Sequence, residues 1–380
     1  MDIKEFILNQ VRAYYKSADI VPTSMEKREF AYGDFEHKIL QRHLSFKNEA
    51  ELRTFLLEKA PMHFHYSPAL YRFPDARPME KKGLMGAELA FDIDITDADL
   101  PCQKAHGKEL VCNNCLGVAK EEIFKLVGDF LIPDFGLKRS DIEINFSGNR
   151  GYHVHVSSQE VLGLSEDARK EISDYISGNG LDFSEIFPTI GQRGVLLGPK
   201  PTDRGWGGKI ARNFIETLEN GVEALIALGI ERRVAKNLYQ KRALVEMGIK
   251  NGNWDMVYIK KKKEFWESIL KKQVIKQSDI IDKNVTDYTT HVIRLPNTIH
   301  GGTGLIARKI QFSELERFNP LDDAIAFKKG EIKVRIEKAP ATVMANQTYG
   351  PFEKTEEFLP SYVAIYYYLK GSAQVLDIRV

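Results

Sequence analysis

The stretch that most constrains this chain is residues 89–95, Leu-Ala-Phe-Asp-Ile-Asp-Ile. Its large apolar residues recur at every second position, which predicts a β-strand with one buried face. Asp92 and Asp94 then share the other face, with their Cβ atoms roughly 6–7 Å apart. Two carboxylates side by side repel each other, so they require protons, a cationic partner or hard metal ions such as Mg²⁺. The pair is a candidate metal site, although Asp also commonly ends strands and begins turns.

The composition is that of an ordinary globular protein. With 380 residues, 43% of them hydrophobic and 28% charged, the chain can bury a large core in two or three structural units. The formal net charge of +1 does not by itself indicate nucleic-acid binding, so such a role must depend on local charge. No apolar run approaches the eighteen or so residues of a membrane span, and the N-terminus does not resemble a signal peptide. We therefore expect a cytoplasmic protein with no membrane partner.

A group of metal-binding residue types follows the predicted strand, with the spacing Cys102-x₃-His106-x₅-Cys112-x₂-Cys115. Three cysteines and a histidine in a short hydrophilic segment fit tetrahedral Zn²⁺. They fill all four ligand positions and leave none for water, so the ion should be structural rather than catalytic. The alternative is three unrelated thiols near a surface histidine. That alternative is disfavoured because every cysteine of the chain lies in this segment, which also argues against a disulfide framework.

Two further strands are predicted at 142–146 and 152–156, joined by Ser147-Gly-Asn-Arg-Gly151. In the second strand His153 and His155 share the face opposite the apolar side chains. A tight turn with two glycines gathers backbone N–H groups, a hydroxyl and a guanidinium, here that of Arg150. This combination is typical of a phosphate-binding concavity. An ordinary hairpin turn is the alternative.

A third group of polar residues comprises Asp282, Arg294 and His300. It adds a carboxylate, an arginine and a histidine almost two hundred residues after the first pair of aspartates. These residues can act with that pair only if the fold reunites them. Arg42 and His43, in a strand-like setting, are further candidates, with a solvated strand edge as an equal alternative.

The centre of the chain changes character. Residues 189–212 are rich in glycine and basic residues and could form a flexible loop that follows a nucleic-acid backbone, with a plain interdomain linker as the alternative. From 213 to 277 apolar residues recur at helical spacing, which predicts a helical insertion. The positive run Lys260–Lys263 lies within it, and most such runs are solvated faces.

Taken in order, these blocks resemble the catalytic small subunit of the archaeal and eukaryotic DNA primases. The resemblance covers nearly the whole chain, and the short zinc segment and modest length are similar to the archaeal branch. The motifs that carry it are the Cys/His group together with Arg28-Glu-Phe, Arg42-His-Leu-Ser-Phe, Phe91-Asp-Ile-Asp, Ser147-Gly-x-Arg-Gly-x-His153, Asp282-x-x-Val-Thr, Arg294-x-Pro-x-x-x-His300 and Leu359-Pro-Ser-Tyr-Val-Ala-Ile-Tyr.

The resemblance implies an α/β (α+β) fold in which the catalytic sheet resembles an RNA-recognition-motif sheet. Residues 1–205 and 277–380 would form the catalytic domain. A zinc-binding module would occupy about 100–117, and 206–276 would form a mainly helical insertion subdomain.

The resemblance also implies primer synthesis on a single-stranded DNA template by two-metal nucleotidyl transfer, with a primase large subunit completing a heterodimer. Asp92, Asp94 and Asp282 would bind Mg²⁺ or Mn²⁺. Asn149 stands where some eukaryotic relatives have a second arginine, which puts a nucleotide contact at that position in doubt. The residues implied to hold the incoming nucleoside triphosphate are Ser147, Arg150, His153, Arg294 and His300.

Two other functions are compatible with parts of this pattern. A gap-filling repair polymerase of the same superfamily shares the carboxylates, but the zinc segment and the helical insertion disfavour it. A non-catalytic, zinc-containing nucleic-acid-binding subunit would be favoured by a missing third carboxylate, and Asp282 is present.

Overall fold

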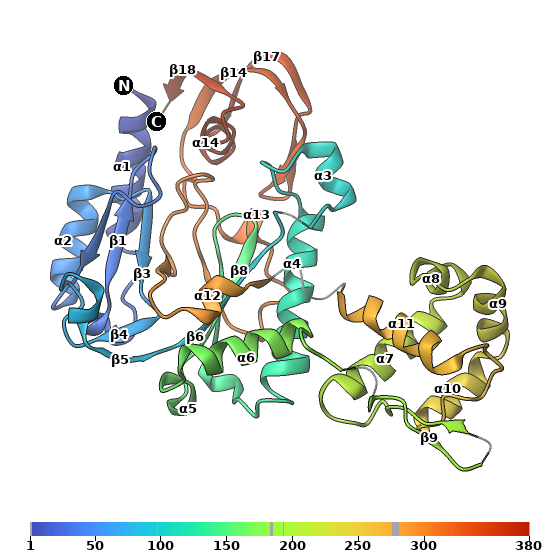
Figure 1. The fold of residues 1–380 in the computed structure, drawn as a ribbon. Helices are drawn as coiled ribbons and strands as arrows, with labels where there is room; N and C mark the ends of the chain where they lie inside the picture. Colours follow the sequence, from blue (N-terminus) through green and yellow to red (C-terminus); the bar gives the residue numbers. More distant parts are fainter. Residues whose placement is uncertain (1, 97, 183–184, 193, 276–280, 380) are drawn as a thin grey trace. The chain divides into compact units, whose positions relative to one another are not determined.

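The computed structural model describes residues 2–379 except 97, 183–184, 193 and 276–280. Its chain divides into two compact units, drawn in Figure 1. The first comprises Met1–Ile123, Lys138–Lys170 and Ile280–Val380, and the second comprises Phe124–Leu137 and Glu171–Asp279. The expected helical insertion at 206–276 lies inside the second unit, which also takes in segments that precede it. Helices and sheets occur together throughout, so the predicted mixed α and β class is confirmed.

An antiparallel five-stranded sheet forms the centre of the first unit. Its apolar face carries Phe91, Val154 and Ile144, which lie opposite one another on adjacent strands and are at most 1% exposed. The alternation that predicted the strand at 89–95 thus buries this face and leaves Asp92 and Asp94 on the other. In spatial order the strands are β11 (Ile281–Asp282), β6 (Leu89–Asp94), β8 (Gly151–Val156), β7 (Ile142–Phe146) and β13 (Lys309–Ile310).

A second, four-stranded sheet contains N-terminal strands and one late strand. Phe30, Phe46 and Phe64 form an aromatic cluster on one side of it, with ring centroids 5.1–6.3 Å apart. Helices α1 (Ile3–Tyr15) and α2 (Glu49–Lys59) lie beside this sheet (Figure 1). The strand order is β12 (Ile293–Arg294), β3 (His63–Tyr66), β1 (Phe30–Gly33) and β2 (Gln41–Leu44), and a separate hairpin joins β4 (Ala69–Tyr71) to β5 (Leu84–Ala87).

The C-terminal segment forms a three-stranded sheet that covers a buried helix (Figure 1). That helix, α14 (Ser361–Leu369), is apolar on nearly all sides, as expected of a helix enclosed in a core. The helix is followed by one last strand of the sheet. The strands are β17 (Phe352–Pro360), β14 (Glu331–Ala339) and β18 (Gln374–Arg379), with a small hairpin of β15 (Thr342–Met344) and β16 (Gln347–Tyr349).

The second unit is mainly helical, and its core is aromatic. Trp254 and Trp266 meet edge to face with ring centroids 4.9 Å apart, and Phe214 lies 4.8 Å from Trp266. Its elements after residue 177 are the hairpin β9 (Thr189–Ile190) and β10 (Val195–Leu196) and the helices α7 (Gly205–Glu219), α8 (Val222–Ala227), α9 (Arg232–Gln240), α10 (Arg242–Lys250) and α11 (Lys262–Ile275).

The remaining helices are mostly short connections. Within the described residues, none of the helices is both long and apolar enough to span a membrane. These connecting helices are α3 (Pro101–His106), α4 (Asn113–Lys125), α5 (Gln159–Leu162), α6 (Glu166–Ser177), α12 (Lys283–Asp287) and α13 (Pro320–Asp323), together with single 3₁₀ turns at Met25–Lys27, Met79–Lys82 and Arg139–Asp141 and a π-helical turn at Leu126–Leu131.

Candidate active site

The polar face of the five-stranded sheet carries a row of chemically active residues. Strand pairing places Asp282 opposite Asp92, and Asp92 opposite His153. The row continues with Asn145 opposite His153 and Lys309 opposite Asn145. Directly opposed residues of antiparallel strands lie close enough to interact. The fold therefore brings Asp282 into register with Asp92, although nearly two hundred residues separate them.

Asp94 stands at the end of β6, beside the glycine turn. It lies opposite Gly151, the first residue of β8, and accepts a hydrogen bond from the backbone N–H of Thr96 at 2.7 Å. A Cβ atom at position 151 would lie 1.8 Å from the backbone oxygen of Ile93, so only glycine allows this close approach. The exposed Asp94 carboxylate is consequently adjacent to the predicted phosphate-binding turn.

His153 is a buried residue of this row and lies opposite Asp92. Its Nε2 lies 3.7 Å from Oδ1 of Asp92, whose side chain is 29% exposed. Burial lowers the pKa of His153 well below its usual value, with further contributions from His155 and Arg294. The imidazole is therefore neutral at physiological pH and can contact an anion through a hydrogen bond rather than a charge.

A second group of histidines surrounds Arg294. This arginine lies opposite His65 on the four-stranded sheet, and its Nη2 donates to Nδ1 of His63 at 3.0 Å. The rings of His63 and His300 are 5.6 Å apart. Burial, and then Arg294, lowers the pKa of His63 to about 3. The same two causes hold the pKa of His300 well below its usual range. Arg294 is thus a buried cation among neutral imidazoles.

His63 and His65 were not among the candidates from the sequence. The signal for them was present, because His63-Phe-His65 alternates in the same way as His153-Val-His155. The alternation alone gave no reason to assign these histidines to a site. That reason comes from the fold, which pairs β3 with β12 and so places His65 opposite Arg294.

The turn between β7 and β8 is pressed against the loop that carries His300. Gly148 has a φ of +85°, and its carbonyl accepts a hydrogen bond from Oγ1 of Thr303 at 2.6 Å. The turn is closed by Ser147, whose N–H donates to the carbonyl of Gly151 at 2.9 Å. Nδ1 of His300 accepts the N–H of Gly302 at 3.1 Å, so the neutral ring carries its proton on Nε2.

Two cationic side chains lie at this turn. Nη1 of Arg150 donates to the carbonyl of Lys108 at 2.6 Å, whereas its Nε is buried and has no hydrogen-bond partner among the described residues. Nζ of Lys370 donates to Oδ1 of Asn149 at 3.2 Å. Lys370 was also missed from the sequence, because it lies 221 residues after Asn149. The predicted turn residues therefore lie together, between the Cys/His segment and the C-terminal helix.

The four predicted zinc ligands do come together. The ligand atoms of Cys102, His106, Cys112 and Cys115 all lie within 4.8 Å of one another. Nδ1 of His106 donates to the carbonyl of Gly107 at 2.7 Å, which leaves Nε2 available for a metal. Burial raises the pKa of the Cys115 thiol to about 12, with the Cys102 thiol adding to the effect. A divalent cation would supply the positive charge that favours thiolates there, so the cluster can hold a zinc ion.

Arg42 and His43 are partly exposed on the edge strand β2, and both reach a buried carboxylate. Both pair with Oε1 of Glu29, at 2.6 and 3.0 Å, and Glu29 is fully buried. Nη2 of Arg42 also donates to the carbonyl of Thr290 at 2.6 Å. Thr290 follows α12, the helix that comes directly after Asp282. Arg42 therefore anchors the segment that delivers the third carboxylate.

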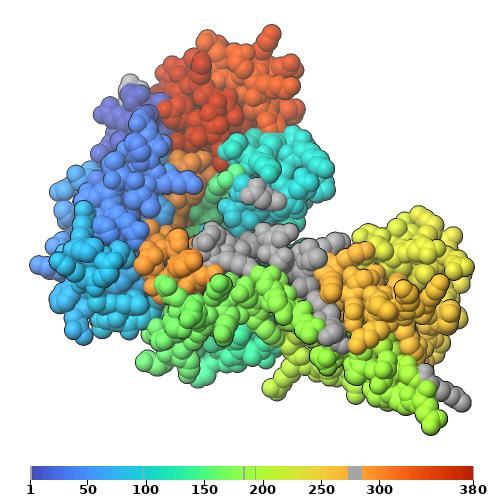
Figure 2. Space-filling view, in the orientation of Figure 1, coloured from blue at the N-terminus to red at the C-terminus, as the bar shows by residue number. Residues whose placement is uncertain are grey.

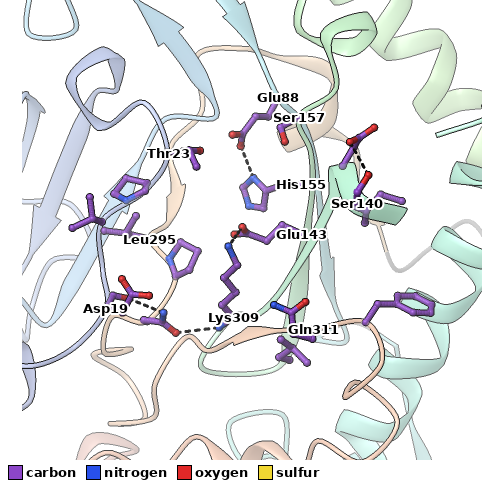
Figure 3. A pocket seen from close by; sticks show the side chains of 18 of the residues that line it. Asp19, Thr23, Glu88, Ser140, Glu143, His155, Ser157, Leu295, Lys309 and Gln311 are labelled. Carbon is purple, nitrogen blue, oxygen red and sulfur yellow. Dashed lines mark hydrogen bonds and ion pairs between the residues drawn. The ribbon is translucent and has the colours of Figure 1, made fainter. Parts of the chain in front are cut away.

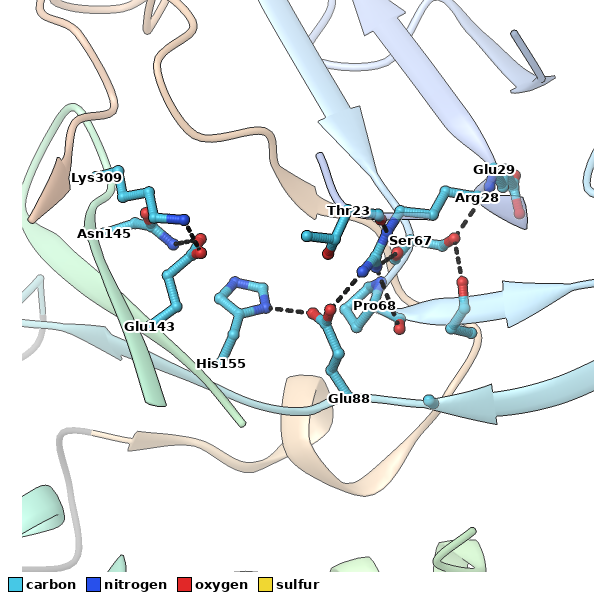
Figure 4. A network of polar contacts seen from close by, with 12 residues as sticks. Thr23, Arg28, Glu29, Ser67, Pro68, Glu88, Glu143, Asn145, His155 and Lys309 are labelled. Carbon is cyan, nitrogen blue, oxygen red and sulfur yellow. Dashed lines mark hydrogen bonds and ion pairs between the residues drawn. The ribbon is translucent and has the colours of Figure 1, made fainter. Parts of the chain in front are cut away.

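A cavity of about 670 Å³ begins one row away from Asp92 on the same polar sheet face, at His155 and Glu143 (Figure 3). Its charged groups are largely paired: Glu88 contacts both Arg28 and His155, and Glu143 contacts Lys309 (Figure 4). The lining has four carboxylates against two cationic side chains, so it does not suit a triphosphate. These charged residues are Asp19, Glu88, Asp141 and Glu143 against Arg139 and Lys309.

An α/β fold with carboxylates in register beside a glycine turn and buried cations is typical of proteins that handle nucleotides. Residues 91–312 match the family model for the DNA primase small subunit. The chain belongs to the DNA primase small subunit family, and the resemblance seen in the sequence is confirmed.

Archaeal relatives match over almost their full length. The DNA primase small subunit PriS of Methanococcoides burtonii is 32% identical, over 98% of this chain and 99% of the relative. The PriS of Thermoplasma acidophilum is 32% identical over 97% of this chain and 99% of the relative. The PriS of Pyrobaculum aerophilum is 32% identical over 96% of this chain and 98% of the relative.

The Cys/His cluster predicts about one zinc per chain in protein purified without added zinc. Strong chelation should lower the melting temperature, because a structural zinc site contributes directly to folding. The variant His106→Ala should lose the metal, whereas His37→Ala, which changes an exposed histidine outside the cluster, should retain it. Metal analysis and thermal denaturation measure both effects. A well-folded protein without zinc would contradict the assignment.

Gly148→Ala should separate the turn from the His300 loop. A Cβ at 148 would lie 2.6 Å from Cβ of His300, on a residue whose φ is +85°. We expect the free energy of unfolding to fall by about 1–3 kcal/mol. Denaturant unfolding measures the loss. Gly163→Ala, where no atom lies within 4 Å of the added Cβ, is the control and should change stability little. Equal effects of the two variants would show that the turn tolerates a side chain.

Proposed function

We propose that this chain is the catalytic subunit of a DNA primase, which makes primers on single-stranded DNA by nucleotidyl transfer. The observation that carries the proposal is the register of the polar sheet face. It puts Asp92 beside Asp282 and puts Asp94 beside the glycine turn. Family membership supports the same activity.

The carboxylates of Asp92, Asp94 and Asp282 are proposed to hold Mg²⁺ or Mn²⁺. Hard divalent ions prefer such oxygen ligands, and the exposed or half-exposed carboxylates on β6 leave room for water and phosphate oxygens. When bound, two such ions would help to activate the 3′-hydroxyl of the primer and to stabilise the leaving pyrophosphate. The protein contributes the fixed spacing of the carboxylates on one strand face.

The incoming nucleoside triphosphate is proposed to lie across the glycine turn. Ser147 and Arg150 would contact it from the turn, and Arg294 would neutralise charge from the interior. His153 and His300 are held neutral by burial, so each would donate one hydrogen bond to a phosphate oxygen without adding a proton to it.

The zinc ion is proposed to be structural and to support the nucleotide site indirectly. The loop 107–111 lies between His106 and Cys112, and the carbonyl of Lys108 in this loop receives Arg150. A metal that holds the two ends of the loop would therefore hold the acceptor of Arg150 in place.

Asp92→Asn tests the proposal. We expect nucleotide addition to fall by roughly 100-fold or more, the scale of losing one preorganised electrostatic contact. The melting temperature should hold or rise, since the change removes one of two mutually repelling charges. Primer synthesis on unprimed single-stranded DNA with Mg²⁺ or Mn²⁺ is the measurement. Asp377→Asn, on the exposed strand β18, is the matched control. Normal synthesis by Asp92→Asn would contradict the proposed role of Asp92 in metal binding.

A second prediction concerns the large subunit. Starting a primer requires two nucleotides on a bare template, whereas the described residues support one proposed triphosphate site and the chain has a net charge of +1. We expect the isolated chain to extend a primer readily and to form the first dinucleotide slowly, with a large subunit supplying the missing contacts. Dinucleotide formation and primer extension are compared with and without that subunit. Equal initiation rates would show that the small subunit suffices. A preference for 5′-phosphorylated gaps would instead favour a repair polymerase.

A further inference from the structure

The C-terminal helix delivers a lysine to the tip of the glycine turn. Lys370 follows α14 directly, and its Nζ donates to the side-chain oxygen of Asn149 at 3.2 Å. Arg150, the next residue of the turn, donates through Nη1 to the carbonyl of Lys108. Two cationic side chains thus lie at neighbouring residues of the same turn.

The position of Lys370 is fixed by contacts with Tyr366 of α14. Its backbone N–H donates to the carbonyl of Tyr366 at 3.0 Å, and its ammonium lies 5.8 Å from the centre of the Tyr366 ring. Tyr366 is fully buried, and its hydroxyl accepts the N–H of Val111 at 3.2 Å. In Figure 2 the cyan segment that contains Val111 adjoins the orange-red C-terminal region. The helix α14 and the Cys/His segment therefore both help to fix the position of Lys370.

The charge of Lys370 is not balanced by a carboxylate. Among the described residues neither Lys370 nor Arg150 forms an ion pair with an acidic side chain within 4.0 Å. Burial lowers the pKa of Lys370 to about 8, and the charge of Arg150 adds to the effect, whereas Glu109 and Asp94 act more weakly in the opposite direction. Keeping an ammonium half-buried beside another cation costs free energy, which an anion bound between them would offset.

The order of groups along the sheet indicates which part of an anion would meet Lys370. Asp92 and His153 form one row, Asp94 and Gly151 form the next, and Asn149 lies beyond them at the tip of the turn. A triphosphate with its α-phosphate at the first row would extend its outer phosphates towards that tip. His300 also lies within electrostatic range of Lys370.

We propose that Lys370, together with Arg150, binds the terminal phosphates of the incoming nucleoside triphosphate. The inference rests on the proposed function, because it assigns a further residue to the same nucleotide site. On binding, Nζ of Lys370 exchanges the Asn149 amide oxygen for a phosphate oxygen, and Asn149 serves as its resting acceptor. Lys370 is a positioning and binding residue in this scheme.

Lys370→Met tests the proposal, because methionine keeps much of the apolar stem beside Tyr366 and removes the charge. A charge-assisted hydrogen bond of this kind predicts about tenfold weaker binding of a non-hydrolysable triphosphate. Binding of the matching monophosphate should not change, since it lacks the terminal phosphates. Lys370→Arg should retain most of the triphosphate affinity. Lys329→Met, at an exposed lysine in the loop before β14, is the matched control and should have no effect.

A relocated charge provides the second arm. Asn149→Arg in the Lys370→Met background places a cation at the same point of the turn, so it should recover part of the triphosphate affinity. Melting temperatures show whether each variant folds. Unchanged triphosphate binding by a folded Lys370→Met, or equal loss for the triphosphate and the monophosphate, would overturn the inference while leaving the proposed function intact. A wild-type chain that binds no triphosphate would overturn both.

Discussion

The pairing of β6 with β8 is the constraint on which the candidate site depends. It sets Asp92 against His153 and Asp94 against Gly151. A slip of one residue would turn both carboxylates to the apolar face, where Phe91 and Ile93 are fully buried. Gly151 permits this register, because its missing side chain lets the backbone of β6 approach. The buried face therefore determines, through register, which polar groups meet on the opposite face.

Electrostatic balance is the second organising feature. The side chains of Asp92 and Asp94 are partly or fully exposed, whereas Arg294 is buried among histidines that burial keeps neutral. Arg294 donates to the carbonyl of Ile299 and to Nδ1 of His63, and the charge of Asp92 acts on it in the direction that favours the charged guanidinium. Arg150 and Lys370 are two further cationic side chains, which lie at the turn between β7 and β8.

Two elements far from the carboxylates hold the turn from outside. The Cys/His segment accepts Arg150 through Lys108, and α14 contacts both Asn149 and that same segment. Under the proposed function, zinc binding and the packing of the C-terminal sheet contribute to nucleotide affinity indirectly, because they hold the turn in place. In the N-terminal sheet, Arg42 likewise connects two segments: it pairs with Glu29 and donates to the carbonyl of Thr290, in the segment after Asp282.

The sequence by itself determined what depends on short-range periodicity and spacing. Alternation in 89–95 and 152–156 identified the strands and the faces that carry Asp92 and His153, and the spacing of three cysteines and a histidine identified a cluster whose ligand atoms do meet. Only the tertiary structure decided the long-range neighbours. It placed His63 beside Arg294, drew Arg42 and His43 to the buried Glu29, and brought Lys370 to Asn149 across 221 residues. Such contacts depend on strand order and on the docking of whole helices, and no local pattern in the chain encodes either.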